Sequence, residues 1–372
     1  MKSTVLLYYP FQMAEKANSG SKVRPIEIYK AFQKWGEREN VEILLLSGNS
    51  LERESKFQDW VQQGKLDNLL FCYMENQTIP LWLTDSGHVP KRPFIDKKVM
   101  KFLKKKDIPV GVFYRDVYWK FDELYPLKGA KRFIMQSIYR MEEKFYEKYC
   151  KVIFLPSDAM GKYVDINTEK IALPPGGKEK KMVPKKDNSN NPKKGLYVGG
   201  INNEDYGLFL LLEAIERVNQ DEDICHLTVV CRAEEYTSLP EEKKKLLKEL
   251  DVEVKHLSGN DLDALYTEMD FAFIPRFKST YNDFSVPVKL VEYLSNHLPV
   301  IATHCEAQKD IIEDGGYGLI CEDKAESMAQ TITAMAEKVD FYRNNIEATF
   351  MNNHSWLARV EKVKSVLLKE EL

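Results

Sequence analysis

The stretch YNDFSVPVKLVEYLSNHLPVI, residues 281–301, holds the pattern from which the fold is predicted. An apolar run expected to be a buried strand, Phe271–Pro275, precedes it, and a second such run begins at Val300. Between these runs, apolar residues recur at helical spacing over Pro287–Asn296, with a proline in the first turn, where a missing N–H costs no hydrogen bond. The order strand, helix, strand predicts one repeat of a parallel sheet.

The same alternation extends along the chain in both directions. In the first half, the expected strands are Thr4–Tyr9, Val41–Ser47, Leu69–Tyr73, Pro109–Tyr114, Val152–Pro156 and Ile171–Leu173, and the expected helices are Pro25–Gly36, Phe94–Lys106 and Ala130–Tyr149. In the second half, the other expected strands are Gly195–Val198, Leu227–Cys231, Val252–Leu257 and Gly318–Ile320, with Val300–Thr303 completing the set; the other expected helices are Leu208–Asn219, Glu241–Leu250, Asp261–Met269 and Lys324–Lys338. The sequence therefore predicts an α/β fold with two Rossmann-like doubly wound domains.

The domain boundaries are predicted from composition. The chain has 372 residues, more than one hydrophobic core usually supports. Residues 176–194 are rich in Lys, Asn, Ser, Pro and Gly and almost free of apolar side chains, which predicts a linker. We therefore expect an N-terminal domain over residues 1–175, a C-terminal domain over 195–354, and a final helix over 355–372 that packs back on the N-terminal domain.

Charge and composition argue against several classes of function. The formal net charge of −3 disfavours a nucleic-acid-binding protein that depends on a large positive field. No apolar run approaches the ~20 residues that cross a bilayer, and the first apolar run is too short for a signal peptide. The six cysteines are scattered, which indicates reduced core thiols in a cytoplasmic protein. The histidines form no metal-binding pattern, so no metal and no cofactor is expected.

The turn that opens the helix Pro287–Asn296 has the features of a phosphate site. The backbone amides of Val286 and Val288 are expected to be unpaired next to Ser285, and the helix dipole favours an anion there. Glu292 lies further along the helix, where a carboxylate accepts hydrogen bonds from a ribose diol. Lys289 is expected to neutralise phosphate or to pair with Glu292, and a plain surface ion pair between these two is the alternative.

This stretch resembles the donor-binding motif of GT-B glycosyltransferases, especially family 4 (group 1), in the form Asn-Asp-(Phe/Tyr)-Ser-x-Pro-x-Lys-Leu-x-Glu-Tyr followed by Pro-Val-Ile. The resemblance implies two domains facing a cleft, a nucleotide-sugar donor and no metal requirement. Its detailed match covers about residues 270–322. The commoner family pattern has a second glutamate eight positions before the one matched by Glu292, where this chain has Phe284. In the family, that glutamate touches the donor sugar. Asp283 is adjacent to Phe284 and is the candidate for this role, although a function as a helix N-cap explains it equally well.

A second donor-binding turn is predicted at Gly199 and Gly200, which end the first strand of the C-terminal domain. Related enzymes have a glycine turn there, commonly followed by Arg and Lys, whereas this chain has Asn202, Asn203 and Glu204. Arg276 and Lys278 follow the strand Phe271–Pro275 and are the expected replacements, because arginine binds a diphosphate with two parallel hydrogen bonds.

The resemblance also implies that two strand exits of the N-terminal domain serve the acceptor and the transferred sugar. The loop after the first strand contributes Gly20, Ser21 and Arg24, and the strand ending near Tyr114 is followed by Arg115 and Asp116. Asp116 is the predicted general base if transfer inverts the anomeric carbon, and an ion pair with Arg115 is the structural alternative. His88, in a polar loop, is a further candidate contact to the acceptor.

The predicted function is therefore transfer of a sugar from a nucleotide-diphosphate donor, with a UDP-sugar favoured, to a glycan or polyprenyl-linked acceptor in polysaccharide or glycoconjugate synthesis. A nucleotide-sugar epimerase on the same scaffold and a non-catalytic glycosyltransferase-like partner subunit are the alternatives. Lysines over residues 97–106 and basic residues over 128–132 alternate with apolar side chains. They predict peripheral contact with anionic lipid at the inner face of the cell membrane.

Overall fold

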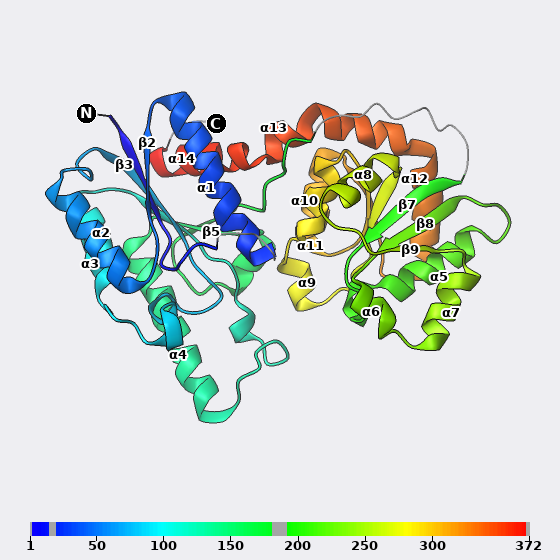
Figure 1. Ribbon diagram of the computed structural model, residues 1–372, viewed down its shortest axis with the longest axis horizontal. Coiled ribbons are helices and arrows are strands. Elements are labelled where there is room, and N and C mark those ends of the chain that lie inside the picture. Colours follow the sequence, from blue (N-terminus) through cyan, green and yellow to red (C-terminus); the bar gives the residue numbers. More distant parts are fainter. Residues whose placement is uncertain (1, 15–19, 181–191, 370–372) are drawn as a thin grey trace. The chain divides into compact units, whose positions relative to one another are not determined.

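A computed structural model describes residues 2–14, 20–180 and 192–369 (Figure 1). The chain divides into two compact units, an N-terminal unit of Met1–Gly176 with Trp356–Leu372 and a C-terminal unit of Gly177–Ser355. These bounds differ by one residue from the domain edges expected at 175 and 355. Most of the linker expected over 176–194 lies outside the described residues, and its last two residues, Lys193 and Lys194, begin a strand.

The N-terminal unit is built on a six-stranded parallel sheet in the order β2-β1-β3-β4-β5-β6. Its strands are β1 (Thr4–Tyr8), β2 (Glu42–Leu46), β3 (Leu69–Glu75), β4 (Val110–Phe113), β5 (Val152–Leu155) and β6 (Glu169–Ala172). Because β1 pairs with both β2 and β3, the strand order reverses beside β1. Such a switch point leaves an opening at the carboxyl ends of the strands.

Helices cover this sheet. They are α1 (Gly20–Glu39), α2 (Ser50–Gln62), α3 (Ile95–Lys105), α4 (Gly129–Tyr149) and α14 (Trp356–Leu368). The C-terminal helix α14 shares a core with α1, through Trp356 and Val360 against Ile28 and Phe32. The expected start of α1 at Pro25 is wrong, because the helix begins at Gly20 and includes Pro25.

The C-terminal unit has a second six-stranded parallel sheet, in the order β12-β11-β10-β7-β8-β9. Its strands are β7 (Lys193–Val198), β8 (Cys225–Val230), β9 (Glu253–Lys255), β10 (Phe271–Ile274), β11 (Val300–Thr303) and β12 (Gly318–Cys321). Here the order reverses between β7 and β10, the strands that precede the two predicted donor-binding turns. The prediction of two doubly wound parallel sheets is confirmed.

The helices of the C-terminal unit are α5 (Leu208–Val218), α6 (Ala233–Thr237), α7 (Glu241–Glu249), α8 (Asn260–Glu268), α9 (Thr280–Phe284), α10 (Val288–Ser295), α11 (Glu306–Gly315), α12 (Ala325–Asn345) and α13 (Met351–His354). Sequence periodicity missed α6, α9, α11 and α13 here, and α2 in the other unit. All six cysteines are buried and free, as predicted. Within the described ranges, no helix is both long and apolar enough to span a membrane.

Candidate functional site

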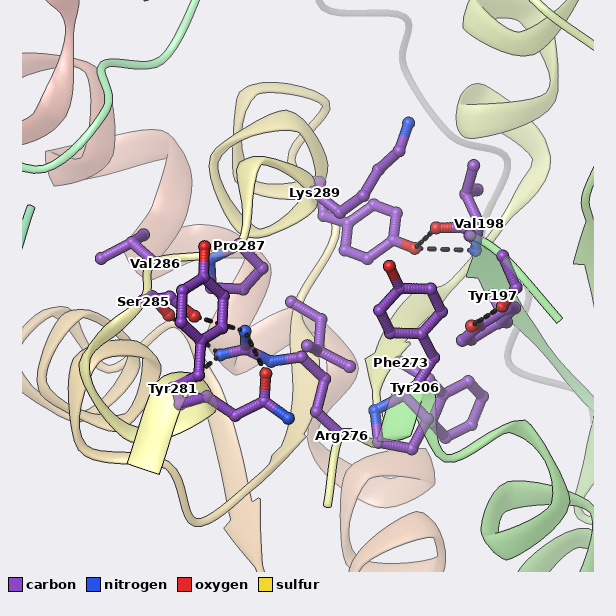
Figure 2. A pocket seen from close by; sticks show the side chains of 16 residues that line it. Tyr197, Val198, Tyr206, Phe273, Arg276, Tyr281, Ser285, Val286, Pro287 and Lys289 are labelled. Atoms are coloured by element: carbon purple, nitrogen blue, oxygen red, sulfur yellow. Dashed lines mark hydrogen bonds between the residues drawn. The ribbon is translucent and has the colours of Figure 1, made fainter. Parts of the chain in front are cut away.

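A cavity of about 360 Å³ opens at the switch point of the C-terminal sheet (Figure 2). The turns after β7 and β10 and the turn between α9 and α10 contribute its walls. Its lining residues are Tyr197, Val198, Gly199, Gly200, Tyr206, Phe273, Ile274, Pro275, Arg276, Tyr281, Asn282, Ser285, Val286, Pro287, Lys289 and Tyr293. Open α/β sheets bind their ligands at this place, and six of the predicted donor-binding residues meet here.

The turn between α9 and α10 presents unpaired backbone amides. Among the described residues, the N–H groups of Val286, Val288 and Lys289 donate to no acceptor. Helix α10 begins at Val288, one residue later than predicted, with Pro287 as its N-cap and no side-chain cap. Free amides at the positive end of a helix dipole form an anion-binding arrangement. The predicted phosphate turn therefore carries free amides, and of these three residues Val286 and Lys289 line the cavity, whereas Val288 does not.

Arg276 lies below this turn and holds it in place (Figure 2). Its Nη1 donates to Ser285 Oγ at 3.1 Å, and its Nη2 donates to the carbonyl oxygens of Ser285 at 3.0 Å and Asn282 at 3.1 Å. Nε and Nη2 also donate to Gln308 Oε1, at 3.2 and 2.9 Å. The guanidinium thus holds Asn282 and Ser285 of the cavity wall against Gln308 of α11 with its full set of donors.

The charge of Arg276 has no counter-ion within the described residues. All its acceptors are amide, hydroxyl or backbone oxygens, and no carboxylate lies within ion-pair distance. The side chain is only 9% exposed, and this burial lowers the pKa of Arg276 from its ordinary value. A buried cation is costly unless an anion compensates it. The cavity that Arg276 lines is therefore electrostatically suited to an anionic ligand.

Glu292 is held at the edge of this site by two partners. Lys289 Nζ lies 2.7 Å from Glu292 Oε2, and the Tyr266 hydroxyl donates to Glu292 Oε1 at 2.7 Å. A carboxylate has about four acceptor positions, so each oxygen retains one for a further donor. Lys289 lines the cavity while pairing with Glu292, so both alternatives raised for this lysine are compatible with the structure.

The glycine turn after β7 forms the opposite wall. The Gly199 amide donates to the Val230 carbonyl at 3.1 Å, and the Gly200 carbonyl accepts from the Tyr197 hydroxyl at 2.6 Å. A Cβ added at Gly200 would lie 2.9 Å from the ring of Tyr206, which also lines the cavity. This glycine therefore allows a close approach of backbone and aromatic ring.

Lys278 and Asp283 do not line the cavity. An Asp283 carboxylate oxygen accepts the Glu306 amide at 3.0 Å, which satisfies the N-terminus of α11, and lies 4.0 Å from Lys278 Nζ. The Lys278 amide donates to Asp323 at 3.2 Å. The structure thus gives Asp283 a role at a helix terminus, although of α11 and not of its own helix. Phe284, which stands in the family's glutamate position, is 2% exposed and packs against Tyr281.

In the N-terminal unit, the structure joins Arg24 and Arg115 through a residue that the sequence analysis missed. Glu75, at the carboxyl end of β3, is fully buried. Its Oε1 accepts from Arg24 Nε at 2.9 Å and from the Tyr73 hydroxyl at 2.6 Å, and its Oε2 lies 3.3 Å from Arg115 Nη2. Arg24 also donates to the Leu173 carbonyl at 2.9 Å. Both predicted acceptor-side arginines therefore pair with one carboxylate. The sequence did contain one signal for Glu75, namely a charged residue at the end of an apolar run.

The other N-terminal candidates are distributed around the same edge of the sheet. Asp116 follows β4, and its Oδ1 accepts the Tyr118 amide at 2.9 Å. Gly20 and Ser21 form the start of α1. His88 has a positive φ of 59°, and its ring lies 2.9 Å from the Leu83 carbonyl. Its ring therefore bonds within its own loop.

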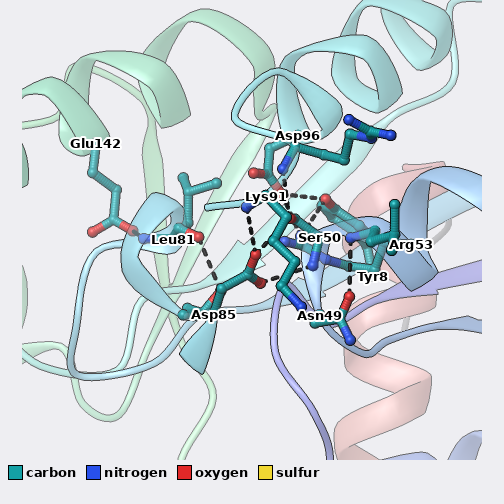
Figure 3. Close-up of polar contacts among 12 residues, drawn as sticks. Tyr8, Asn49, Ser50, Arg53, Leu81, Asp85, Lys91, Asp96 and Glu142 are labelled. Atoms are coloured by element: carbon teal, nitrogen blue, oxygen red, sulfur yellow. Dashed lines mark hydrogen bonds and ion pairs between the residues drawn. The ribbon is translucent and has the colours of Figure 1, made fainter. Parts of the chain in front are cut away.

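Buried carboxylates fix that loop, residues 76–94, to the N-terminal unit (Figure 3). Asp85 accepts the Ser50 amide at 2.8 Å and the Lys91 amide at 3.0 Å. Glu142 of α4 accepts the Leu81 amide at 2.8 Å. Burial raises the pKa of Glu142 to about 8. Next to this loop, the Arg53 guanidinium pairs with Asp96 in a buried contact.

Two doubly wound units with a ligand cavity at a switch point define the GT-B class of fold. Solved structures with this fold include HepE from Anabaena in complex with UDP, with a TM-score of 0.61, 13% identity and coverage of 99% of this chain and 100% of that chain. The lipopolysaccharide outer core galactosyltransferase WaaB is similar with a TM-score of 0.59, 11% identity and coverage of 99% and 100%. Sucrose-phosphate synthase from Thermosynechococcus elongatus has a TM-score of 0.58, 11% identity and coverage of 98% of both chains.

Residues 192–338 match the family model of the glycosyl transferases, group 1. This segment contains β7 to β12 and every residue that lines the cavity. The C-terminal unit is thus of group 1 glycosyltransferase type, and the resemblance found in the sequence is confirmed. A comparison with curated protein sequences found no match.

Proposed function

We propose that this protein is a glycosyltransferase that moves a sugar from a nucleotide-diphosphate donor, preferably a UDP-sugar, to a glycan or lipid-linked acceptor in polysaccharide or glycoconjugate synthesis. The observation that carries the proposal is the buried, uncompensated guanidinium of Arg276 beneath the open amides of Val286, Val288 and Lys289. A diphosphate supplies the missing negative charge and the missing acceptors in one group. The group 1 match and the UDP bound in the HepE structure support a nucleotide-sugar as that group.

The proposed arrangement of the donor follows from these contacts. The diphosphate binds at the start of α10, and the ribose diol donates to the free acceptor positions of Glu292. Arg276 acts through the turn that it holds, because its donors are already bonded to Ser285, Asn282 and Gln308. In this proposal Arg276 positions the backbone amides and contributes its charge. The sequence had suggested instead that Arg276 binds the diphosphate directly with two hydrogen bonds.

In the transfer step, the bond between the anomeric carbon and the diphosphate breaks, and a bond from that carbon to an acceptor oxygen forms. The nucleoside diphosphate leaves with the electron pair of the broken bond. The proton of the acceptor hydroxyl passes to Asp116 if the configuration is inverted, or to the leaving phosphate if it is retained. No metal takes part in the proposed step. The proposed place of action is the cytoplasm, at the inner face of the cell membrane when the acceptor is lipid-linked.

Nucleotide binding tests this proposal most simply. A ligand that binds only the folded protein raises its melting temperature, so the melting temperature is measured with UDP, GDP, TDP and ADP. We expect UDP to give the largest rise. Absence of a rise with all four nucleotides contradicts a nucleotide-sugar site. Incubation of the UDP-sugar that binds best, with and without acceptor, then separates transfer from epimerisation, because an epimerase alters the donor alone.

The role of Glu292 gives a second test of the same site. We expect Glu292→Ala to lower the rate of sugar transfer, because the ribose loses its acceptor. A variant that transfers sugar as fast as the parent contradicts the assignment. Circular dichroism of the variant provides the control for folding.

A further inference from the structure

We propose that Gln308 is a positioning residue for the cavity of Figure 2, and that its uncharged amide reserves the positive charge of Arg276 for the diphosphate. Gln308 belongs to α11 and is fully buried. It does not line the cavity, so it acts through Arg276, which does. This role rests on the proposed function, because a diphosphate is the ligand that Arg276 is proposed to meet.

The amide oxygen of Gln308 receives one edge of the guanidinium. Gln308 Oε1 accepts from Arg276 Nη2 at 2.9 Å and from Nε at 3.2 Å. Further bonds from Nη1 and Nη2 reach Ser285 and Asn282, which line the cavity. The arginine therefore links α11 to the turn that carries the open amides, and Gln308 is the anchor on the α11 side.

A second set of hydrogen bonds fixes the orientation of the Gln308 amide. Its Nε2 donates to the Thr303 carbonyl at 2.5 Å, and Thr303 Oγ1 donates to the Arg276 carbonyl at 2.5 Å. Thr303 is the last residue of β11 and is fully buried. Because Nε2 is bonded to this carbonyl, Oε1 faces the guanidinium. The end of β11 thus holds both the amide and the backbone of the arginine.

The common reason for a glutamine at this place in a helix does not explain Gln308. It is the third residue of α11, a position from which glutamine or glutamate often accepts the backbone amide of the N-cap residue. The N-cap residue here is Cys305, whose amide donates to the Thr303 carbonyl at 2.8 Å instead. The Gln308 side chain therefore serves Arg276 and not the start of its own helix.

Elsewhere the chain pairs buried arginines with carboxylates. Arg24 pairs with Glu75, and Arg53 pairs with Asp96. All four of these side chains are buried. A glutamate in place of the α11 glutamine would have nearly the same shape and would form the same kind of pair with Arg276. That pair would compete with an anionic ligand for the guanidinium, whereas an amide oxygen accepts its hydrogen bonds and leaves the charge uncompensated.

The acidic groups that act on the pKa of Arg276 are also uncharged at neutral pH. They are the thiol of Cys305 and the phenols of Tyr281 and Tyr206. Burial raises the pKa of the Cys305 thiol further from neutrality. The charge of Arg276 is therefore expected to make affinity follow the charge of the ligand, in the order UDP, UMP, uridine.

Titration calorimetry of Gln308→Glu and Gln308→Met tests this role against a purely structural one. In Gln308→Glu the carboxylate pairs with Arg276, so UDP and inorganic pyrophosphate are expected to bind roughly tenfold or more weakly, while uridine affinity stays within about twofold. Gln308→Met removes the hydrogen bonds without adding charge, and its UDP affinity is expected to fall by roughly threefold. A purely structural role predicts the opposite order, because glutamate can still bond to the guanidinium and methionine cannot.

The matched control is Gln220→Glu, which adds the same charge at an exposed position after α5 and is expected to keep UDP affinity within about twofold. Circular dichroism verifies the folding of each variant. Unchanged UDP affinity in Gln308→Glu, or an equal loss for UDP and uridine, overturns the proposal. So does a larger loss in Gln308→Met than in Gln308→Glu. If Gln308→Glu does not fold, a loss of UDP affinity of roughly tenfold or more in Gln308→Met overturns it.

Pyrophosphate separates the role of Gln308 from the proposed function. A parent protein that binds pyrophosphate but not UDP contradicts a nucleotide-sugar donor, and weaker pyrophosphate binding by Gln308→Glu then still supports the role of Gln308. A parent that binds UDP no better than Gln308→Glu contradicts the role of Gln308 and leaves the proposed function in place. A parent that binds neither ligand contradicts both.

Discussion

The two units bury arginines at corresponding places and treat their charge differently. In the N-terminal unit, Arg24, on the helix after β1, and Arg115, after β4, share the buried carboxylate of Glu75 at the end of β3. In the C-terminal unit, Arg276 lies at the switch point beside β7 and β10 and contacts neutral acceptors alone among the described residues. The comparison indicates that the arginines of the first site have a carboxylate partner within the chain, whereas the charge of Arg276 is left for the anionic ligand that the proposed function requires.

The largest expected effect comes from removing the Glu75 carboxylate, which pairs with both arginines of the N-terminal site. Glu75→Ala leaves the buried Arg24 without its ion-pair partner, and breaking a buried pair costs about 3–5 kcal/mol. We expect a loss of this size in the free energy of unfolding, measured in urea. The control Asp67→Ala breaks an exposed pair with Lys106 and is expected to cost less than about 1 kcal/mol. Equal, small losses would contradict the claim that the buried carboxylate of Glu75 stabilises the N-terminal site.

A smaller effect is expected at Glu292, whose carboxylate pairs with Lys289 and Tyr266 and is proposed to accept from the ribose as well. The parent is expected to bind UDP roughly tenfold more tightly than 2′-deoxy-UDP, because Glu292 accepts from the ribose diol. In Glu292→Ala this preference is expected to disappear in titration calorimetry, whereas Glu268→Ala, on the exposed side of α8, retains it. A preference that survives in Glu292→Ala assigns ribose binding to another residue.

The buried Glu142 predicts a pH dependence in the N-terminal unit. Its pKa is raised to about 8 from an ordinary 4.5, so the folded protein binds a proton that the unfolded chain has released between these values. The free energy of unfolding is therefore expected to fall as the pH rises from about 5 to 8. Glu142→Gln is expected to lose at least about 1 kcal/mol of this fall. Glu37→Gln, an exposed control on α1, is expected to keep it, and an unchanged slope in Glu142→Gln contradicts the assignment.

The smallest effect is expected at Asp283, for which sequence and structure suggest different roles. Because its carboxylate accepts an amide at the start of α11, Asp283→Asn is expected to cost about 1 kcal/mol or less of unfolding free energy. Transfer activity is expected to remain within about twofold of the parent. A folded Asp283→Asn protein with strongly reduced turnover would restore the catalytic role inferred from the family pattern.

Most of the fold was predictable from the sequence, because the buried parallel strands are apolar runs and most of the longer helices between them have an apolar periodicity. The twelve strands of the structure coincide with the predicted runs to within a few residues. Helix α2 was missed although Asn49 and Glu52 form a capping box, a signal that the sequence carries. Helices α9 and α11 are short and flank the site. Such short segments give few repeats of an apolar periodicity.

The site was only partly predictable. Residues close in sequence, such as Ser285, Val286 and Lys289, were found because one turn brings them together. The Gln308 acceptor of Arg276 and the Tyr266 partner of Glu292 lie on other helices, and no local spacing indicates them. The neutral surroundings of Arg276 are likewise a property of the folded chain, because they depend on how far the described carboxylates lie from the guanidinium.

Calorimetric titration of Arg276→Gln with UDP and with uridine tests the central claim most directly. The account predicts that the variant binds UDP roughly ten- to a hundredfold more weakly, since a charge-assisted contribution is about 1.5–3 kcal/mol, while uridine binding changes little. Circular dichroism verifies the fold. Equal loss for UDP and uridine, or no loss for either, would contradict the claim that the buried charge of Arg276 exists to meet a diphosphate.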